Sequence, residues 1–135
     1  MICDGENYKS PFGVNWTIGY FRLANIDIPV GGGFKGRAEF YNKTTQLWGT
    51  ICDDNWENSY NAKVFCNSLG MPKNYASFTS LNTGNRAPSY NKWQVSGAIN
   101  MDNVSCATGQ ESSLDKCSYD YRNDCTHGED VIVTC

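Results

Sequence analysis

The amino-acid sequence predicts an α+β fold held together by disulfide bonds. Three observations lead to this class. Residues 47–52 place aromatic and β-branched side chains at the two-residue period of a strand, residues 59–69 repeat apolar side chains at helical spacing, and seven cysteines accompany a single histidine. With 135 residues, the chain is most naturally one domain and is long enough to bury a core.

The first half of the chain is expected to contain strands. Residues 14–18 are a candidate edge strand within a largely polar start. Residues 37–41 alternate Ala38 and Phe40 with neighbours that suit a solvent-facing side, which indicates a half-buried strand. Residues 47–52 form the next and most strongly patterned strand.

A helix is expected directly after this strand. Turn-forming residues 52–55 end the strand, and Asn58 or Ser59 can cap the helix that follows. Gly70 suits a left-handed residue at the helix end, and Pro72 prevents continuation. One apolar face with the spacing i, i+3, i+4 and i+7 consists of Ala62, Phe65, Cys66 and Leu69.

The second half of the chain is less regular. Residues 72–100 form a long polar connection, and loops of this length are usually functional or partly structured. Short strands are expected within 95–104 and one helical turn within 112–116. A β-branched strand over 131–135 is expected to close the chain.

Composition narrows the function. The net charge of −3 argues against a nucleic-acid binder, which usually carries a basic stripe. No pair of cysteines is spaced as CxxC, so disulfides are favoured over zinc, and the domain is expected outside the reducing cytosol. No apolar run is long enough to insert directly into a membrane. No signal peptide is recognisable, so the sequence is expected to be a mature or excised fragment.

Ordered motifs run through most of the chain. The longest are Trp48-Gly49-Thr50-Ile51-Cys52-Asp53-Asp54-Asn55-Trp56 and Ala62-Lys63-Val64-Phe65-Cys66-Asn67-Ser68-Leu69-Gly70. Shorter ones lie at 21–23, 36–40, 101–106, 111–117 and 125–130, with Cys135 at the end. Together they closely resemble the scavenger receptor cysteine-rich (SRCR) family. The resemblance implies an SRCR domain over 21–135, preceded by an extension over 1–20. It also implies a curved, mostly antiparallel sheet that cradles the 59–69 helix, with a second short helix near 112–116.

The same resemblance implies a disulfide pattern that the sequence alone leaves open. The chain looks like the six-cysteine form of the family. In the eight-cysteine form an extra pair occupies the positions of Phe34 and Met71, and these two apolar side chains are expected to fill that space by direct contact. Cys3 has no family position, and a free thiol, an interchain bridge or a bond to a neighbouring domain all stay open. The implied bridges are Cys52–Cys125, Cys66–Cys135 and Cys106–Cys117.

Acidic residues form a candidate metal site. In calcium-binding family members, the positions of Asp53 and Asp54 combine with that of Glu111, and the position of Asp102 can contribute to a second site. Asn103 replaces a common second Asp, which weakens the second site. Oxygen ligands without His or Cys suit calcium, with magnesium as the alternative. The simpler interpretation is that the aspartates cap a turn and the other acids are solvated.

Other residues have weaker functional or structural assignments. Trp48 and Trp56 are expected as core anchors. His127 is expected to hold a turn, since the nearby cysteines should be oxidised and offer no nucleophile. Candidate ligand contacts in the long connection are Arg86, Tyr90, Lys92 and Trp93. Glycosylation sequons begin at Asn15, Asn42 and Asn103.

The sequence thus predicts an extracellular ligand-recognition module and not an enzyme. The module is expected in a secreted protein or in the extracellular part of a membrane protein. The resemblance implies calcium-dependent binding of polyanionic, microbial, glycan or protein ligands, as in receptors of innate immunity. A bound ion would let an acidic domain recruit an anion. The alternative is a structural or assembly module of a secreted or matrix protein, linked through Cys3.

Overall fold

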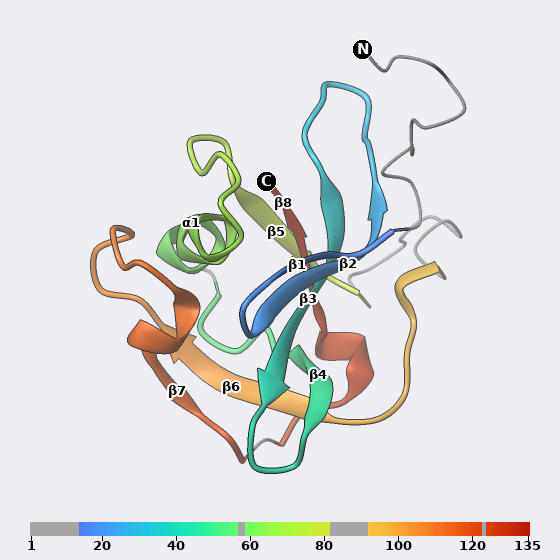
Figure 1. Cartoon of the computed structure of the whole chain (residues 1–135), viewed down its shortest axis with the longest axis vertical. Coiled ribbons are helices and arrows are strands. Elements are labelled where there is room, and N and C mark those ends of the chain that lie inside the picture. The colour runs from blue at the N-terminus through green and yellow to red at the C-terminus, as the bar shows by residue number, and fades with distance from the viewer. Residues whose placement is uncertain (1–13, 57–58, 82–91, 123) are drawn as a thin grey trace.

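The computed structural model describes residues 14–56, 59–81, 92–122 and 124–135. A β-sheet runs through the molecule, and helix α1 lies beside it (Figure 1). Within these ranges, no helix is long and apolar enough to cross a membrane. The elements are β1 (Trp16–Ile18), β2 (Phe21–Asp27), β3 (Lys35–Asn42), β4 (Leu47–Ile51), α1 (Ser59–Ser68), β5 (Ser77–Ser80), β6 (Ile99–Ser105), η2 (Leu114–Lys116), β7 (Ser118–Asp120), η3 (His127–Glu129) and β8 (Val131–Thr134).

The sheet is open and mixed. Its strand order is β1-β2-β3-β4-β6-β7, and β8 pairs with both β3 and β5. These pairs are antiparallel except for β4 and β6, which run parallel. Strand β3 joins the two parts of the sheet, because residues 35–37 pair with β8 and residues 39–42 pair with β4. The predicted α+β class, a mostly antiparallel sheet with one main helix, is confirmed.

Helix α1 packs its predicted apolar face into the core. The four side chains of that face, Ala62, Phe65, Cys66 and Leu69, are each at most 1% exposed. Gly70 ends the helix with a φ of 68°, a left-handed conformation that glycine adopts easily. The N–H of Met71 then donates to the carbonyl oxygen of Cys66 at 3.0 Å. The helix boundaries therefore agree with the predicted 59–69 within one residue.

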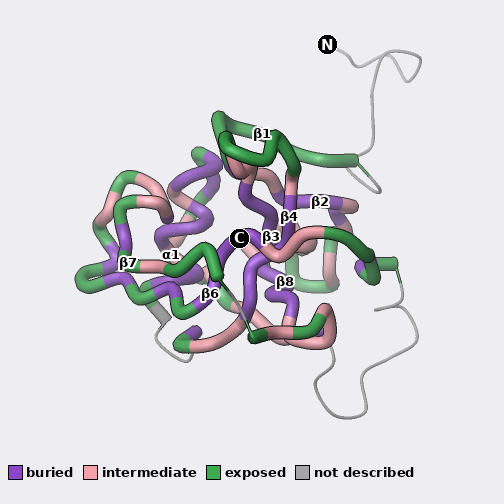
Figure 2. The backbone as a smooth tube through the Cα atoms, turned by 90° about the horizontal axis from the view of Figure 1, so that it is seen from below, coloured by how far each residue is buried: buried purple, intermediate pink, exposed green. Residues whose placement is uncertain are grey.

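The core lies between α1 and one face of the sheet. Figure 2 shows β3 and β8 largely buried and β1 exposed at the surface. Trp56 is fully buried in this core, as predicted. The prediction for Trp48 is wrong. Phe40 faces the core, so Tyr41 and its cross-strand partner Trp48 lie on the other face, since strand side chains alternate.

Three disulfide bonds hold the elements together. Cys52–Cys125 joins the end of β4 to the segment before η3, and Cys66–Cys135 joins α1 to the last residue. Cys106–Cys117 closes a short loop after β6. These are the pairs that the family resemblance implied. The first two span 73 and 69 residues, and long cross-links restrict the unfolded chain most in the chain-entropy model.

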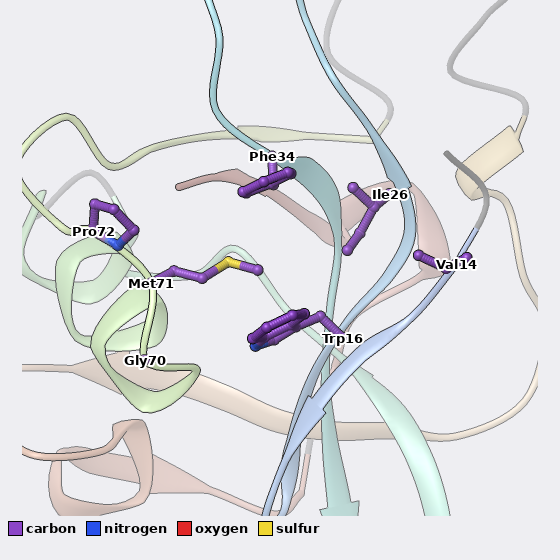
Figure 3. Close-up of a pocket in the computed structure, with 7 residues that line it drawn as sticks. All are labelled: Val14, Trp16, Ile26, Phe34, Gly70, Met71 and Pro72. Atoms are coloured by element: carbon purple, nitrogen blue, oxygen red, sulfur yellow. The ribbon is translucent and has the colours of Figure 1, made fainter. Parts of the chain in front are cut away.

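An apolar pocket lies between β1, the residue before β3 and the residues that follow α1. Phe34 and Met71 line the same pocket (Figure 3), so they lie near each other as predicted, but the space between the lining residues is open and not filled as predicted. The pocket encloses about 300 Å³. The indole N–H of Trp16 donates to the carbonyl oxygen of Leu69 at 2.9 Å, which ties β1 to the end of α1. The remaining lining residues are Val14, Trp16, Ile26, Gly70 and Pro72.

Candidate functional site

Three segments that are distant in sequence meet where β4 ends. The N–H of Cys52 donates to the carbonyl oxygen of Met101 on β6 at 2.9 Å. The N–H of Asp53 donates to the carbonyl oxygen of Glu129 in η3, also at 2.9 Å. The Cys52–Cys125 disulfide adds a covalent link to the segment before η3. The acidic turn after β4 is therefore held between β6 and η3.

Carboxylates gather at this junction. Asp53, Asp54 and Glu129 present oxygen atoms within 4.8 Å of one another, and Asp54 and Asp102 approach each other equally closely. The nearby sulfur atoms of Cys52 and Cys125 belong to a disulfide, so the available donors are oxygen atoms. A hollow of about 520 Å³ opens beside them. It is lined by Asp53, Asp54, Asn55, Phe78, Ser80 and Asn103.

Burial and neighbouring carboxyl groups shift the pKa of Asp54 upward. Desolvation is the largest cause, followed by the hydrogen bond to Asp102 and the charges of Asp102, Glu129 and Asp124. Together they raise the pKa of Asp54 to about 6. A cation placed among these groups would offset the same repulsion without a proton.

Asn61 holds the acidic turn against the end of β6. Its side chain is fully buried on α1. The amide nitrogen donates to the carbonyl oxygens of Asn55 at 3.2 Å and Val104 at 2.8 Å. The amide oxygen accepts the N–H of Cys106 at 3.0 Å. One helix residue thus fixes the two segments that carry most of the acidic groups.

Asp102 and Asn103 border the site from β6. Asp102 is only 2% exposed, and its carboxylate accepts the N–H of Asn103 at 2.7 Å. The amide nitrogen of Asn103 donates to Asp120 at 3.0 Å, and its oxygen faces the amide of Asn55 at 3.5 Å. Asn55 and Asn103 have φ values of 71° and 53°, a left-handed conformation that asparagine tolerates better than most residues.

Glu111 lies in a different cluster from Asp53 and Asp54. Its ligand atoms group with the sulfur atoms of Cys106 and Cys117. Its carboxylate accepts the N–H groups of Ala107, Thr108 and Gly109 and the hydroxyl of Thr108, at 2.9 to 3.2 Å. Hydrogen bonds from backbone N–H groups lower the pKa of Glu111 to about 2. Among the described residues, the glutamate that the fold brings to Asp53 and Asp54 is therefore Glu129, to which the sequence pattern assigned no role.

The sequence contained a signal for Glu129. The residue lies four positions after Cys125, whose implied bond to Cys52 brings the segment to the acidic turn. Glu129 also completes a capping box with Thr126, and its carboxylate accepts the N–H of Thr126 at 3.0 Å. This local role explains its place in η3, and a carboxylate oxygen of Glu129 lies within 4.8 Å of oxygen atoms of Asp53 and Asp54.

The candidate ligand contacts are only partly described. Arg86 and Tyr90 lie outside the described residues. Cys3, whose partner the sequence left open, also lies outside them. Lys92 forms an ion pair with Asp27 at 2.6 Å. Trp93 is 1% exposed, and its indole N–H donates to the carbonyl oxygen of Asn25 at 2.9 Å, so it is buried and not a ligand contact.

His127 bridges two acceptors. Its Nδ1 lies 2.8 Å from the Asp130 carboxylate, and its Nε2 lies 3.0 Å from the carbonyl oxygen of Gly97. Asp130 is fully buried. The geometry matches a histidine that holds the turn before β8.

The three sequons occupy different environments. Asn15 is exposed, and its side-chain oxygen accepts the N–H of Asn25 at 3.0 Å. Asn42 closes the turn between β3 and β4 by accepting the N–H of Thr44 at 2.8 Å. Asn103 lines the acidic hollow, so a glycan there would crowd the site.

The donor set suits a hard divalent cation. Carboxylate and amide oxygens are the ligands that calcium and magnesium prefer, and calcium accepts irregular, flexible sets more readily. Burial first, and then the neighbouring carboxylates, disfavour the charged form of Asp54 and raise its pKa, and a bound cation would counter both effects. The residues present therefore fit such an ion.

Comparison with known proteins agrees with this architecture. The family model of the scavenger receptor cysteine-rich domain matches residues 31–135. The chain belongs to the SRCR family. The SRCR domain is also similar to the crystal structure of the dimeric form of the SRCR domain of mouse MARCO, with a TM-score of 0.60 and 40% identity, covering 78% of this chain and 89% of that chain.

The curated relatives are longer proteins. Macrophage receptor MARCO of Mus musculus is 41% identical over 108 residues, which are 78% of this chain and 18% of the relative. The Mesocricetus auratus form is 42% identical over 109 residues, 78% of this chain and 19% of that protein. CD5 antigen-like of Homo sapiens is 36% identical over 106 residues, 74% of this chain and 26% of that protein. The SRCR domain thus spans about a quarter or less of these relatives.

Proposed function

We propose that this SRCR domain is a non-enzymatic, extracellular recognition module for polyanionic, microbial, glycan or protein ligands. The observation that carries the proposal is the convergence of Asp53, Asp54 and Glu129 at one end of the sheet. Relatives named as a macrophage receptor support a receptor role. Three disulfides support a secreted protein or the extracellular part of a membrane protein.

The proposed cation site consists of Asp53, Asp54 and Glu129, with Asp102 and Asn103 at its edge. Glu129 takes the place that the sequence pattern assigned to Glu111. When bound, calcium supplies open coordination positions to a sulfate, phosphate or carboxylate group. Magnesium fits the same donors less well, since it demands a more regular geometry.

Contacts within the chain position the side chains of the proposed site before any ligand binds. The backbone contact between Asp53 and Glu129 sets the spacing of the turn and η3. The hydroxyl of Ser80 donates to the carboxylate of Asp53 and orients it. The open side of the hollow leaves room for an anionic ligand. These features support recognition at low reorganisation cost.

A non-enzymatic role agrees with the chemistry of the described residues. The cysteines near His127 are bonded in a disulfide, so they provide no thiolate. Both ring nitrogens of His127 already face acceptors. The residue is therefore engaged structurally.

Calorimetric titration of calcium into the parent domain, Glu129→Gln and Glu111→Gln tests the proposal. Glutamine can keep the capping box at 129 while removing the charge. We expect Glu129→Gln to weaken calcium binding by about tenfold or more, because a charged ligand is lost. Glu111→Gln is the matched control and should retain the parent affinity. A reversed pattern would restore Glu111 as the ligand, and no calcium binding by the parent domain would refute the ion-dependent mechanism.

The alternative is a role in assembly. One observation favours it, the dimeric form named for the similar mouse MARCO domain. Sedimentation and non-reducing electrophoresis of the full chain test it. Dimers that persist at micromolar concentration would support the role, and dimers lost in Cys3→Ser would place the link at that cysteine.

A further inference from the structure

An open edge of the sheet carries exposed apolar side chains. Within the described residues, β1 pairs with β2 alone, which leaves the other side of β1 open. All three residues of β1 are exposed, and Figure 2 shows the strand at the surface. Trp16 and Ile18 are 47% and 48% exposed, and Val14, just before the strand, is 40% exposed. Their two-residue spacing places these apolar side chains on one face.

This edge lacks common forms of protection against pairing with another chain. Natural proteins block open edges with charged side chains, proline, bulges or very short strands. The strand Trp16-Thr17-Ile18 contains neither a charge nor a proline, and its pairing with β2 is regular. The extended stretch is also longer than β1 itself, because the carbonyl oxygen of Val14 accepts the N–H of Ile26 at 2.9 Å. An exposed apolar edge of this kind favours edge-to-edge association.

A glycosylation sequon lies on the same stretch. It consists of Asn15, Trp16 and Thr17. Asn15 and Thr17 are both exposed, and their spacing places them on the face opposite to Trp16. The side-chain oxygen of Asn15 accepts the N–H of Asn25 at 3.0 Å, which fixes the side chain by its oxygen. Among the described residues, none accepts a hydrogen bond from its Nδ2 atom, so this atom is open to modification.

The other two sequons have different surroundings. Nδ2 of Asn103 donates to Asp120 at 3.0 Å, and Asn103 lines the acidic hollow. The oxygen of Asn42 accepts the N–H groups of Thr44 and Thr45 at 2.8 and 3.3 Å in an exposed turn. Asn42 ends β3, which β2 separates from β1 in the sheet. Only the sequon of Asn15 therefore lies on the open edge of β1.

We propose that Asn15 carries an N-linked glycan that covers the open edge of β1. This inference goes beyond the proposed recognition function and relies only on its extracellular location. In the modification, Nδ2 of Asn15 forms a bond to C1 of the first sugar of an oligosaccharide that is linked to a lipid diphosphate. The bond between C1 and the diphosphate oxygen breaks, the lipid diphosphate leaves, and the amide nitrogen loses one proton.

The position of the glycan explains how it would block association. A strand that pairs with β1 must come within about 4.8 Å of it, the usual spacing of neighbouring strands. An N-linked glycan is bulky and solubilising, so a glycan attached directly before β1 occupies the space through which such a strand approaches. It thus serves in place of the charge or proline that other edge strands carry.

The experiment expresses the full chain behind a cleavable secretion signal in cultured animal cells. All chains carry Cys3→Ser, which excludes a disulfide between chains through that cysteine. Mass spectrometry of the secreted protein measures occupancy, because enzymatic removal of the glycan leaves an aspartate at each occupied asparagine. Analytical ultracentrifugation measures self-association of the same material.

Two variants remove the sequon at the edge. Asn15→Gln removes the modified nitrogen, whereas Thr17→Ala keeps the side chain of Asn15 and its contact with Asn25. Thr44→Ala is the matched control, because the same substitution removes the sequon of Asn42. Thermal unfolding of every secreted variant verifies the fold.

We expect Asn15 to be glycosylated in most parent molecules. Both edge variants should self-associate about tenfold more tightly than the parent, because the apolar edge is uncovered. Thr44→Ala should behave as the parent does. Adding Ile18→Lys to Thr17→Ala should restore the behaviour of the parent, because a charge on an edge strand opposes pairing.

Three outcomes would overturn the proposal. The first is a secreted parent chain in which Asn15 is unmodified. The second is an occupied Asn15 whose loss in both edge variants leaves self-association unchanged. The third is equal self-association of Thr17→Ala and Thr44→Ala, since the position of the glycan would then not matter.

These outcomes are separate from the proposed recognition function. Asn15 does not line the acidic hollow, so an unmodified Asn15 would leave the calcium site as it is. Conversely, a parent domain that binds no calcium in the titration would refute the ion-dependent mechanism and leave the glycan at Asn15 unaffected.

Discussion

Carboxylate oxygen atoms of Asp54 and Asp102 lie within 4.8 Å of each other where β4 and β6 meet. Two carboxyl groups can share a hydrogen bond only if one of them holds a proton. Burial and the nearby charge of Asp102 both favour a proton on Asp54, and a cation at the pair would relieve the same repulsion.

The first prediction concerns the pH dependence of this pair. In EDTA, the folded-state pKa of Asp54, about 6, exceeds its usual value of 3.8. The folded state thus binds more protons between these two values, so the free energy of unfolding should fall as pH rises from about 4 to above 6. Urea unfolding at stepped pH measures this change. Asp54→Asn should remove this component, and an unchanged slope in the variant would contradict the assignment.

The second prediction concerns Asn61. Asn61→Ala should lower the free energy of unfolding by about 3 kcal/mol, because it leaves buried backbone groups of Asn55, Val104 and Cys106 without their partner. Urea denaturation measures the loss. The control is Asn67→Ala, which removes one donor to the carbonyl oxygen of Glu111 and should cost about 1 kcal/mol.

Calcium affinity gives Asn61 a second readout. Because Asn61 holds the acidic turn against β6, the folded fraction of the Asn61→Ala variant should also bind calcium more weakly than the Asn67→Ala variant does. Equal calcium affinity in the two variants would limit Asn61 to a role in stability.

The third prediction uses the pocket between Phe34 and Met71. The double variant Phe34→Cys/Met71→Cys should form a fourth disulfide, because both side chains line one pocket where the eight-cysteine form has its extra bridge. The gain in unfolding free energy should be at most about 4 kcal/mol in the chain-entropy model, less where existing bridges already shorten the loop. Mass spectrometry after thiol alkylation counts the free cysteines. Two additional alkylated thiols in the folded double variant would show that the pocket walls are too far apart.

The fourth prediction concerns His127. Burial lowers its pKa, but the hydrogen bonds to Asp130 and Gly97 and the charge of Asp130 outweigh this and raise the pKa above 6.5. A carboxylate and a carbonyl oxygen can both be satisfied only by the doubly protonated ring. The resulting stability should be present below pH 6.5 and lost as pH rises through the folded-state pKa.

Unfolding of His127→Gln measured from pH 5 to 9 tests this sign. The variant should lack the fall in stability that the parent shows at the upper end. A parent domain that becomes more stable over that window would contradict the double protonation.

The elements that follow local patterns could be predicted from the sequence. The periodicities of α1 and β4 and the stop at Gly70 depend on neighbouring residues, and the structure agrees with them. Strand β5 lacks such a pattern, since three of its four residues are serine or threonine and its pairing with the distant β8 defines it. Strand β1 lies before residue 21, yet it pairs with β2 and so belongs to the same sheet. The domain boundary between 1–20 and 21–135 stays a prediction.

The wrong prediction for Trp48 and the separation of Glu111 from the aspartates have one physical cause. Alternation shows that a strand has two faces, but it does not show which face meets the helix. Likewise, the sequence contains several acids after β6, and only the path of the chain decides which one reaches Asp53. Glu111 is satisfied by N–H groups within four residues of it, whereas Glu129 is brought to the turn by the Cys52–Cys125 segment.

The disulfide network also determines how the domain responds to mechanical tension. If residues 14 and 135 are pulled apart, the shortest covalent path crosses the Cys52–Cys125 bond. Beyond Cys52 the force has a second path, because the Cys66–Cys135 bond ties α1 directly to the pulled residue. Strands β5, β6 and β7 lie between Cys66 and Cys125, outside both paths, and are shielded from the load. The acidic turn and the first part of α1 lie on one of the two loaded paths and η3 lies on the other, so tension would act on the junction of the acidic turn with η3 and on the helix together.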